Sequence, residues 1–150
     1  MDKSIYKVGI VSLILVIIFY LIAIIGKETL PVITIIALLF VFPLAIVSAF
    51  AFIAGYMTSG KTSGAVWSGI GFAVIVYIAT EILAFPFKES KFVTKMKNFS
   101  NTNKGITAHL SNSVRGNIHW SIVWLIILAV IFALIGFALN EKRKKEKIRQ

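Results

Sequence analysis

The sequence contains no cysteine, two histidines and only six acidic residues in 150 positions. The lack of cysteine excludes disulfide bonds, thiolate metal ligands and cysteine nucleophiles. Asp2 is the single aspartate, so no aspartate pair is present for acid–base catalysis, and no serine lies in the G-x-S-x-G pattern of a nucleophile elbow. His109 and His119 lack the compact spacing of a metal-binding motif. We therefore expect no enzymatic activity, no metal site and no cofactor.

Apolar residues, in contrast, make up 58% of the chain, compared with about 45–50% in soluble domains. They are gathered into four long runs, and a helix needs about 20 mainly apolar residues to cross a bilayer. The sequence therefore predicts an all-α integral membrane protein in which residues 1–150 form one membrane domain with four transmembrane helices. The expected spans are residues 8–25, 32–57, 64–85 and 120–139.

Small residues flank the short turn between the second and third runs. Ala65, Gly69 and Ala73 recur every four residues, so they share one face of a helix. Gly55 and Gly64 lie on the two sides of the turn. Because small residues let helix backbones approach closely in a membrane, this pattern predicts a central, tightly packed helical hairpin.

Pro43 lies in the middle of the second run. Proline removes one helical hydrogen bond and its ring presses on the preceding turn, so we expect a kink there. A structural bend is the main interpretation, and a functional gate is the alternative.

Residues 55–62 match G-x-x-x-x-G-K-[ST], the pattern of a phosphate-binding loop. That loop joins a strand to a helix, and its magnesium ion needs a carboxylate on a second strand. Here both flanks are needed as membrane spans, so we interpret the match as a helix connector. In this connector Gly60 closes one helix, Lys61 faces lipid headgroups, and Thr62 or Ser63 caps the next helix.

From Phe52 to Gly69 the chain reads FIAGYMTSGKTSGAVWSG. This segment resembles a hairpin of small archaeal multi-spanning membrane proteins of uncharacterised function. The shared features are an A-G-Y turn, a glycine followed by a few polar residues, and G-A-x-x-x-G at the start of the next helix. The resemblance covers under a fifth of the chain and implies a fold type without an activity.

The net charge of +10 is concentrated in a loop, residues 86–118, and in the tail, residues 141–150. We interpret the tail as an anchor for anionic lipid headgroups, and we expect no nucleic-acid partner. A basic tail directly after a span predicts that both termini are cytoplasmic in a multi-pass protein of the cell membrane. The loop fits either interfacial amphipathic helices or a solvated segment, and Asn98 fits a glycosylation sequon.

Glu81 is the one acidic residue within a predicted span, and such residues are functional candidates because they are costly in a membrane. Pairing with Lys27 or His119 is our main interpretation. Proton or cation handling and an unpaired interfacial carboxylate are the alternatives. Two functions follow: a structural or accessory subunit with a membrane-protein partner or a second copy of the chain, or a small transporter, channel or holin-like pore that uses Glu81.

Overall fold

The computed structural model describes residues 3–58, 61–83 and 114–148, which form four long helical segments. Each of the four is long and apolar enough to cross a membrane. The predicted all-α membrane protein with four spans is thus confirmed. The helices are α1 (Lys3–Gly26), α2 (Val32–Ile36), the π-helical turn η1 (Ala37–Val41), α3 (Phe42–Met57), α4 (Thr62–Leu83) and α6 (Val114–Ile148), of which α2, η1 and α3 together make the second span.

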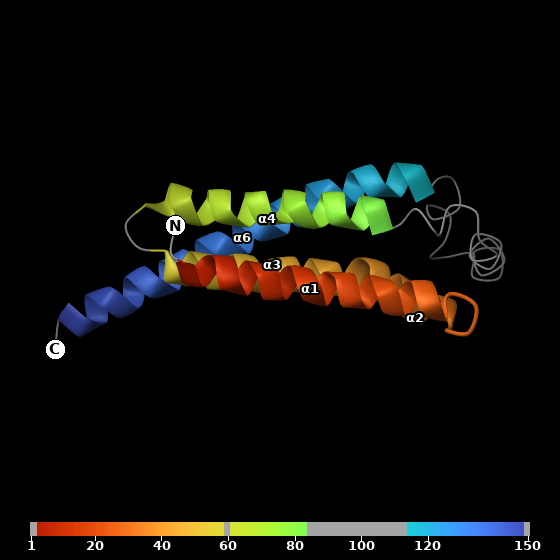
Figure 1. Ribbon diagram of the computed structural model, residues 1–150. Helices are drawn as coiled ribbons and strands as arrows, with labels where there is room; N and C mark the ends of the chain where they lie inside the picture. The colour runs from red at the N-terminus through yellow and green to blue at the C-terminus, as the bar shows by residue number, and fades with distance from the viewer. Residues whose placement is uncertain (1–2, 59–60, 84–113, 149–150) are drawn as a thin grey trace.

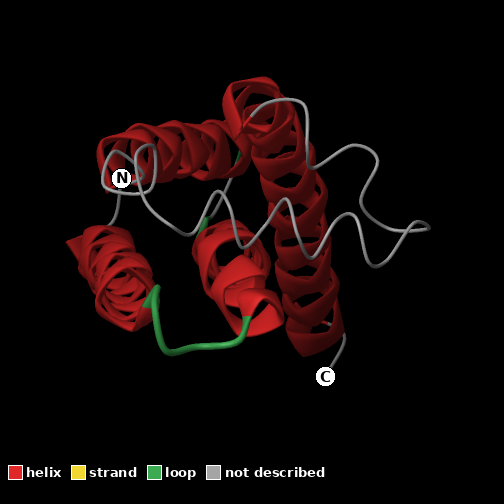
Figure 2. Cartoon of the chain, turned by 90° about the vertical axis from the view of Figure 1, so that its right-hand side faces the viewer, coloured by secondary structure: helices red, strands yellow, loops and turns green. Residues whose placement is uncertain are grey.

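α1, the second span and α4 lie roughly along one axis, with successive spans antiparallel, and α6 crosses them at an angle (Figures 1 and 2). Both chain termini lie at the same end of the bundle as the link between α3 and α4 (Figure 1). We call this the turn end; it contains Thr58 and Lys61. The opposite end contains the link between α1 and α2, residues 27–31, and we call it the link end.

The described links show why the helices end where they do. α1 ends at Gly26, whose carbonyl oxygen accepts hydrogen bonds from the amides of Thr29 and Leu30 at 3.0 and 2.8 Å. At the other end of the bundle, α3 ends at Met57 because Thr58 is extended, with ψ of 130°. The Thr58 hydroxyl donates to the carbonyl of Ala54 at 2.7 Å, which satisfies a carbonyl of the last helical turn. Gly60, the expected helix terminator, lies outside the described residues.

The most extensive contact between described helices is that of α3 with α6. Two glycines make it possible, one on each helix. A Cβ on Gly55 would lie 2.1 Å from the carbonyl oxygen of Ala133, and a Cβ on Gly136 would lie 2.1 Å from that of Phe52. Because both obstacles are backbone atoms, the two helices touch backbone to backbone, as small residues allow in membranes.

α4 completes a three-helix unit with α3 and α6. A Cβ on Gly69 would lie 3.2 Å from the Ala129 carbonyl oxygen of α6 and 3.4 Å from Cβ of Ala51 on α3. Ala65 and Ala73, on the same face of α4, are fully buried. The closely packed hairpin of α3 and α4 is therefore present, and the face that joins these two helices also holds α6.

α1 is the outermost helix of the four and packs mainly on the second span. Phe19 stacks on Phe42 of α3 with ring centroids 4.7 Å apart. Much of the rest of α1 is exposed apolar surface, including Ile10, Ile14 and Ile18. In a helix that spans a membrane, such side chains face lipid.

We predict that Gly55→Ala and Gly136→Ala each lower the free energy of unfolding in detergent micelles by about 1–3 kcal/mol, because the added methyl group must push backbone apart. Gly71→Ala is the matched control. It is also a helical glycine, but apart from its own stretch of helix no described atom lies within 4 Å of its Cβ position. Equal effects at all three positions would contradict the role assigned to the α3–α6 contact.

Candidate functional site

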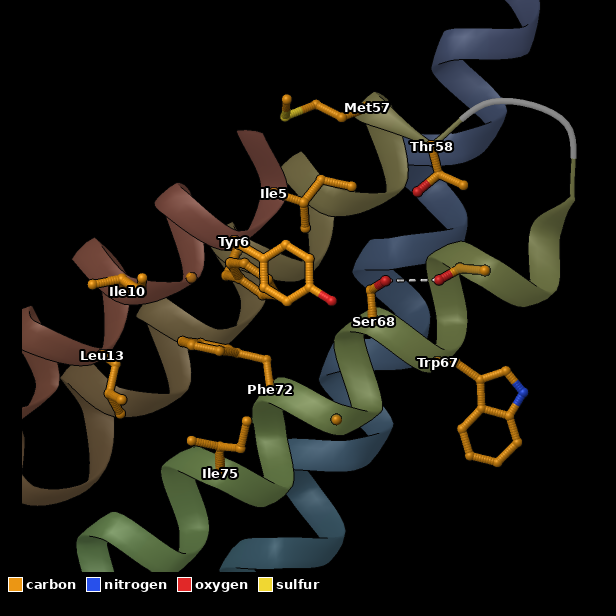
Figure 3. A pocket seen from close by; sticks show the side chains of 14 residues that line it. Ile5, Tyr6, Ile10, Leu13, Met57, Thr58, Trp67, Ser68, Phe72 and Ile75 are labelled. Carbon is orange, nitrogen blue, oxygen red and sulfur yellow. Dashed lines mark hydrogen bonds between the residues drawn. The ribbon is translucent and has the colours of Figure 1, made fainter. Parts of the chain in front are cut away.

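An open cavity of about 950 Å³ lies between α1 and α4 at the turn end (Figure 3). We call it the α1–α4 groove. Its floor includes Phe50 of α3, whose ring lies against Phe72 of α4 with centroids 4.0 Å apart. α1 approaches this floor through Gly9, where a Cβ would lie 3.2 Å from the Phe50 ring. On the other wall, Gly71 leaves the groove open because it has no side chain.

The polarity of the groove changes along its length. Its hydroxyl-bearing side chains, those of Tyr6, Thr58 and Ser68, all lie near the turn end, together with the apolar Ile5 and Met57. Deeper in the groove the lining is apolar and includes Leu13 and Ile75 (Figure 3). The Ser68 hydroxyl donates to the carbonyl of Gly64 at 2.8 Å, so this polar group is satisfied within its own helix. A ligand with one polar end and one apolar end matches this gradient.

The second span departs from regular α-helix immediately before Pro43. Proline has no amide hydrogen, so the carbonyl of Leu39, four residues earlier, lacks its usual α-helical donor. The chain widens there into η1, where the Phe42 amide bonds the Ala37 carbonyl five residues back. The buried hydroxyl of Tyr20 on α1 donates to the Leu39 carbonyl at 3.1 Å. The helix irregularity is thus coupled to the position of α1.

Glu81 lies in the last described turn of α4, towards the link end, and its side chain is half-buried. It is close enough to Tyr20 and Tyr77 to interact with them electrostatically, and Thr80 lies beside Tyr20. Among the described side chains no ion pair joins Glu81 to Lys27. The side chain of His119, the other expected partner, lies outside the described residues.

The basic tail continues α6 as a helix to Ile148 and projects beyond the bundle at the turn end (Figure 1). We call residues 140–148 the basic arm. Two hydrogen bonds attach its base to the end of α3: Asn140 Nδ2 donates to the Thr58 carbonyl at 3.1 Å, and Arg143 donates to the Tyr56 hydroxyl. Further along, Lys144 pairs with Glu141 at 3.0 Å on the exposed surface.

The phosphate-loop match overlaps two membrane helices. Its first residues, 55–57, are the last turn of α3 and do not follow a strand, and its last residue, Thr62, begins α4. In the part of the chain that the structure describes, no group of three histidine or acidic side chains is placed to hold a metal ion. Asn98, His109 and loop residues 86–113 lie outside the described residues, whereas residues 114–118 of the expected loop belong to α6.

The small residues selected from the sequence meet in more than one place. Gly55 packs on α6, whereas Gly69, Ala65 and Ala73 lie at the junction of α4 with its neighbours. Gly64 faces the methyl group of Thr58 across the turn at 3.5 Å from its Cβ position. Sequence reasoning missed the α1–α4 groove and the bond from Tyr20 to Leu39. The missing amide at Pro43 signalled a free carbonyl, but nothing along the chain indicated its donor.

Comparison of the chain with protein families, with curated proteins and with solved structures finds no match. The assignment of a function therefore depends on the sites described above.

We predict that Tyr20→Phe lowers the free energy of unfolding in detergent by about 1 kcal/mol, because the Leu39 carbonyl loses a buried hydrogen bond. In a Pro43→Ala background the loss should be much smaller, since the alanine amide supplies the missing donor. The unaltered protein, the two single variants and the double variant form a double-mutant cycle that isolates the coupling between the Tyr20 hydroxyl and Pro43. Tyr6→Phe, at an exposed position of the same helix, is the control, and an equal loss from Tyr20→Phe in both backgrounds would disprove the coupling.

Proposed function

We propose that the chain is a non-catalytic, multi-pass subunit of an assembly in the cell membrane, with both termini in the cytoplasm. Its membrane domain would hold the basic arm in a fixed position at the membrane surface, where the arm contacts an acidic segment of a membrane-protein partner and neighbouring anionic headgroups. The single observation that carries this proposal is the attachment of the arm to the end of α3.

The attachment matters because a basic tail that serves only as a lipid anchor needs no defined direction. Here the hydrogen bonds from Asn140 and Arg143 join the arm to α3, and the arm is continuous with the membrane helix α6. Its side chains are mainly exposed, and basic residues outnumber acidic ones. An exposed, oriented, basic helix is suited to an acidic partner surface, because complementary charge steers association and sets orientation.

The packing of the membrane domain favours an accessory role over a pore. In the described residues the buried polar side chains are Ser12, Ser48 and Ser68. Ser48 and Ser68 each donate to a carbonyl of their own helix at 2.8 Å. The pore or transporter alternative rests on Glu81 and its two tyrosine neighbours at the link end, and the described core between that end and the turn end is lined by apolar and small side chains.

The orientation is tested by single cysteines, since the chain contains none. In right-side-out vesicles, an impermeant thiol reagent should label Lys27→Cys from outside and label Lys61→Cys only after the vesicles are opened. The two positions lie at opposite ends of the bundle, so labelling of both from one side would overturn the four-span topology.

The role of the arm is tested by purifying the protein from its native membranes in mild detergent and measuring the mass of the particle. We expect a complex larger than the 16.6 kDa chain. The charge reversals Lys142→Glu and Lys145→Glu, introduced together, should release the partner because they remove the charge complementarity. Lys27→Glu, at the link end, is the control and should leave the complex intact.

A stable, lone monomer of the unaltered protein would contradict the proposal. So would a complex that survives reversal of the arm charges, or one that the Lys27→Glu control dissociates equally.

A further inference from the structure

We propose that the α1–α4 groove binds one acyl chain of an anionic phospholipid from the leaflet at the turn end, with the lipid phosphate beside Lys61. This site is separate from the basic arm, and the inference does not depend on the partner proposed above.

The length of the groove fits one leaflet. Its lining residues on α4 extend from Gly64 to Ile75, and at about 1.5 Å of rise per residue this is roughly 16 Å. Half of a ~30 Å hydrocarbon core is about 15 Å. The groove therefore runs from the membrane surface to about the midplane, which is the depth that one acyl chain occupies. A transmembrane helix of a partner would need a groove along the whole bundle.

The level of the groove in the membrane is indicated by Trp67. This residue lies at the rim with its indole pointing away from α1, and it is 70% exposed (Figure 3). Tryptophan is enriched at the boundary between headgroups and hydrocarbon. The hydroxyls of Tyr6, Thr58 and Ser68 lie in the same part of the groove, so its polar end coincides with the headgroup region and its apolar end with the hydrocarbon.

The charge at the turn end selects the headgroup. Lys61 is exposed immediately before α4, and its carbonyl accepts a hydrogen bond at 3.1 Å from the amide of Gly64, which lines the groove. Of the described charged residues at this end, the basic ones outnumber the acidic ones, which are Glu141 and Glu146 on the arm. A lysine at headgroup level attracts anionic lipid.

The volume and shape of the groove also suit a single chain. At about 950 Å³ it lies near the upper end of the ~300–1,000 Å³ range of small-molecule sites. Beyond the hydroxyls of Tyr6, Thr58 and Ser68 its lining is apolar, and in a membrane that part of the bundle is surrounded by hydrocarbon. In an empty groove the side chains of Phe72, Leu13 and Ile75 would lack dispersion contacts on one side. An acyl chain bound in the groove supplies these contacts.

The test uses the full-length protein in vesicles of equal parts phosphatidylglycerol and phosphatidylcholine. After transfer to mild detergent, native mass spectrometry counts the lipids that each protein retains. We expect the unaltered protein to retain one phosphatidylglycerol. Gly71→Leu should abolish this retention, because its side chain fills the groove at a position where no described atom outside its own stretch of helix lies within 4 Å of the Cβ. Lys61→Gln should leave a bound lipid but remove the preference for phosphatidylglycerol.

Two controls separate the groove from general lipid contact. Ala138→Leu adds the same side chain at an exposed position of α6 outside the groove, and Lys27→Gln removes a charge at the link end; both should retain phosphatidylglycerol as the unaltered protein does. Ile10→Trp fills the groove from α1 and repeats the test if Gly71→Leu fails to fold.

Three results would overturn the proposal. The first is no retained lipid in the unaltered protein, and the second is equal retention in the groove variants and the controls. The third is a dimer or larger particle that Gly71→Leu dissociates, because the groove would then bind a protein helix.

Discussion

The close contact of α3 with α6 is the constraint on which the rest of the structure depends. Gly55 and Gly136 lie against backbone carbonyls of the opposite helix, and a single Cβ at either position would occupy space that a backbone oxygen fills. Lipid is as apolar as a leucine side chain, so helix association in a membrane relies on such fit. α4 packs on both α3 and α6 at Gly69. This contact sets the position of α4 relative to the other two helices.

Pro43 introduces the second constraint. Its missing amide leaves the Leu39 carbonyl in need of a donor inside the membrane, where an unsatisfied backbone group is costly. Tyr20 supplies that donor from α1, and the stack of Phe19 on Phe42 lies at the same level. α1 is thereby attached to the second span through its C-terminal half. In its N-terminal half, α1 meets the rings of Phe50 and Phe72 at Gly9, and the α1–α4 groove lies around this contact.

The two constraints concentrate the distinctive features of the protein at one membrane surface. The groove opens there, Lys61 lies there, and the basic arm leaves the bundle there along the axis of α6. The Asn140 bond to the Thr58 carbonyl joins the arm to the same residue that lines the groove. A lipid in the groove and a partner on the arm would therefore meet the protein on the same side, through adjacent but different residues.

The sequence by itself determined the class of the protein, the number of spans and the helical hairpin, because hydrocarbon admits only segments that satisfy their own backbone and the apolar runs have the required length. It also indicated that the phosphate-loop match at residues 55–62 is a helix connector, because the segments on both sides of the match were needed as spans. Only the tertiary structure decided that Gly55 faces α6, that Tyr20 bonds Leu39, and that α1 and α4 leave a groove. Helical periodicity defines which residues share a face, but the choice of facing helix depends on how all four helices pack together.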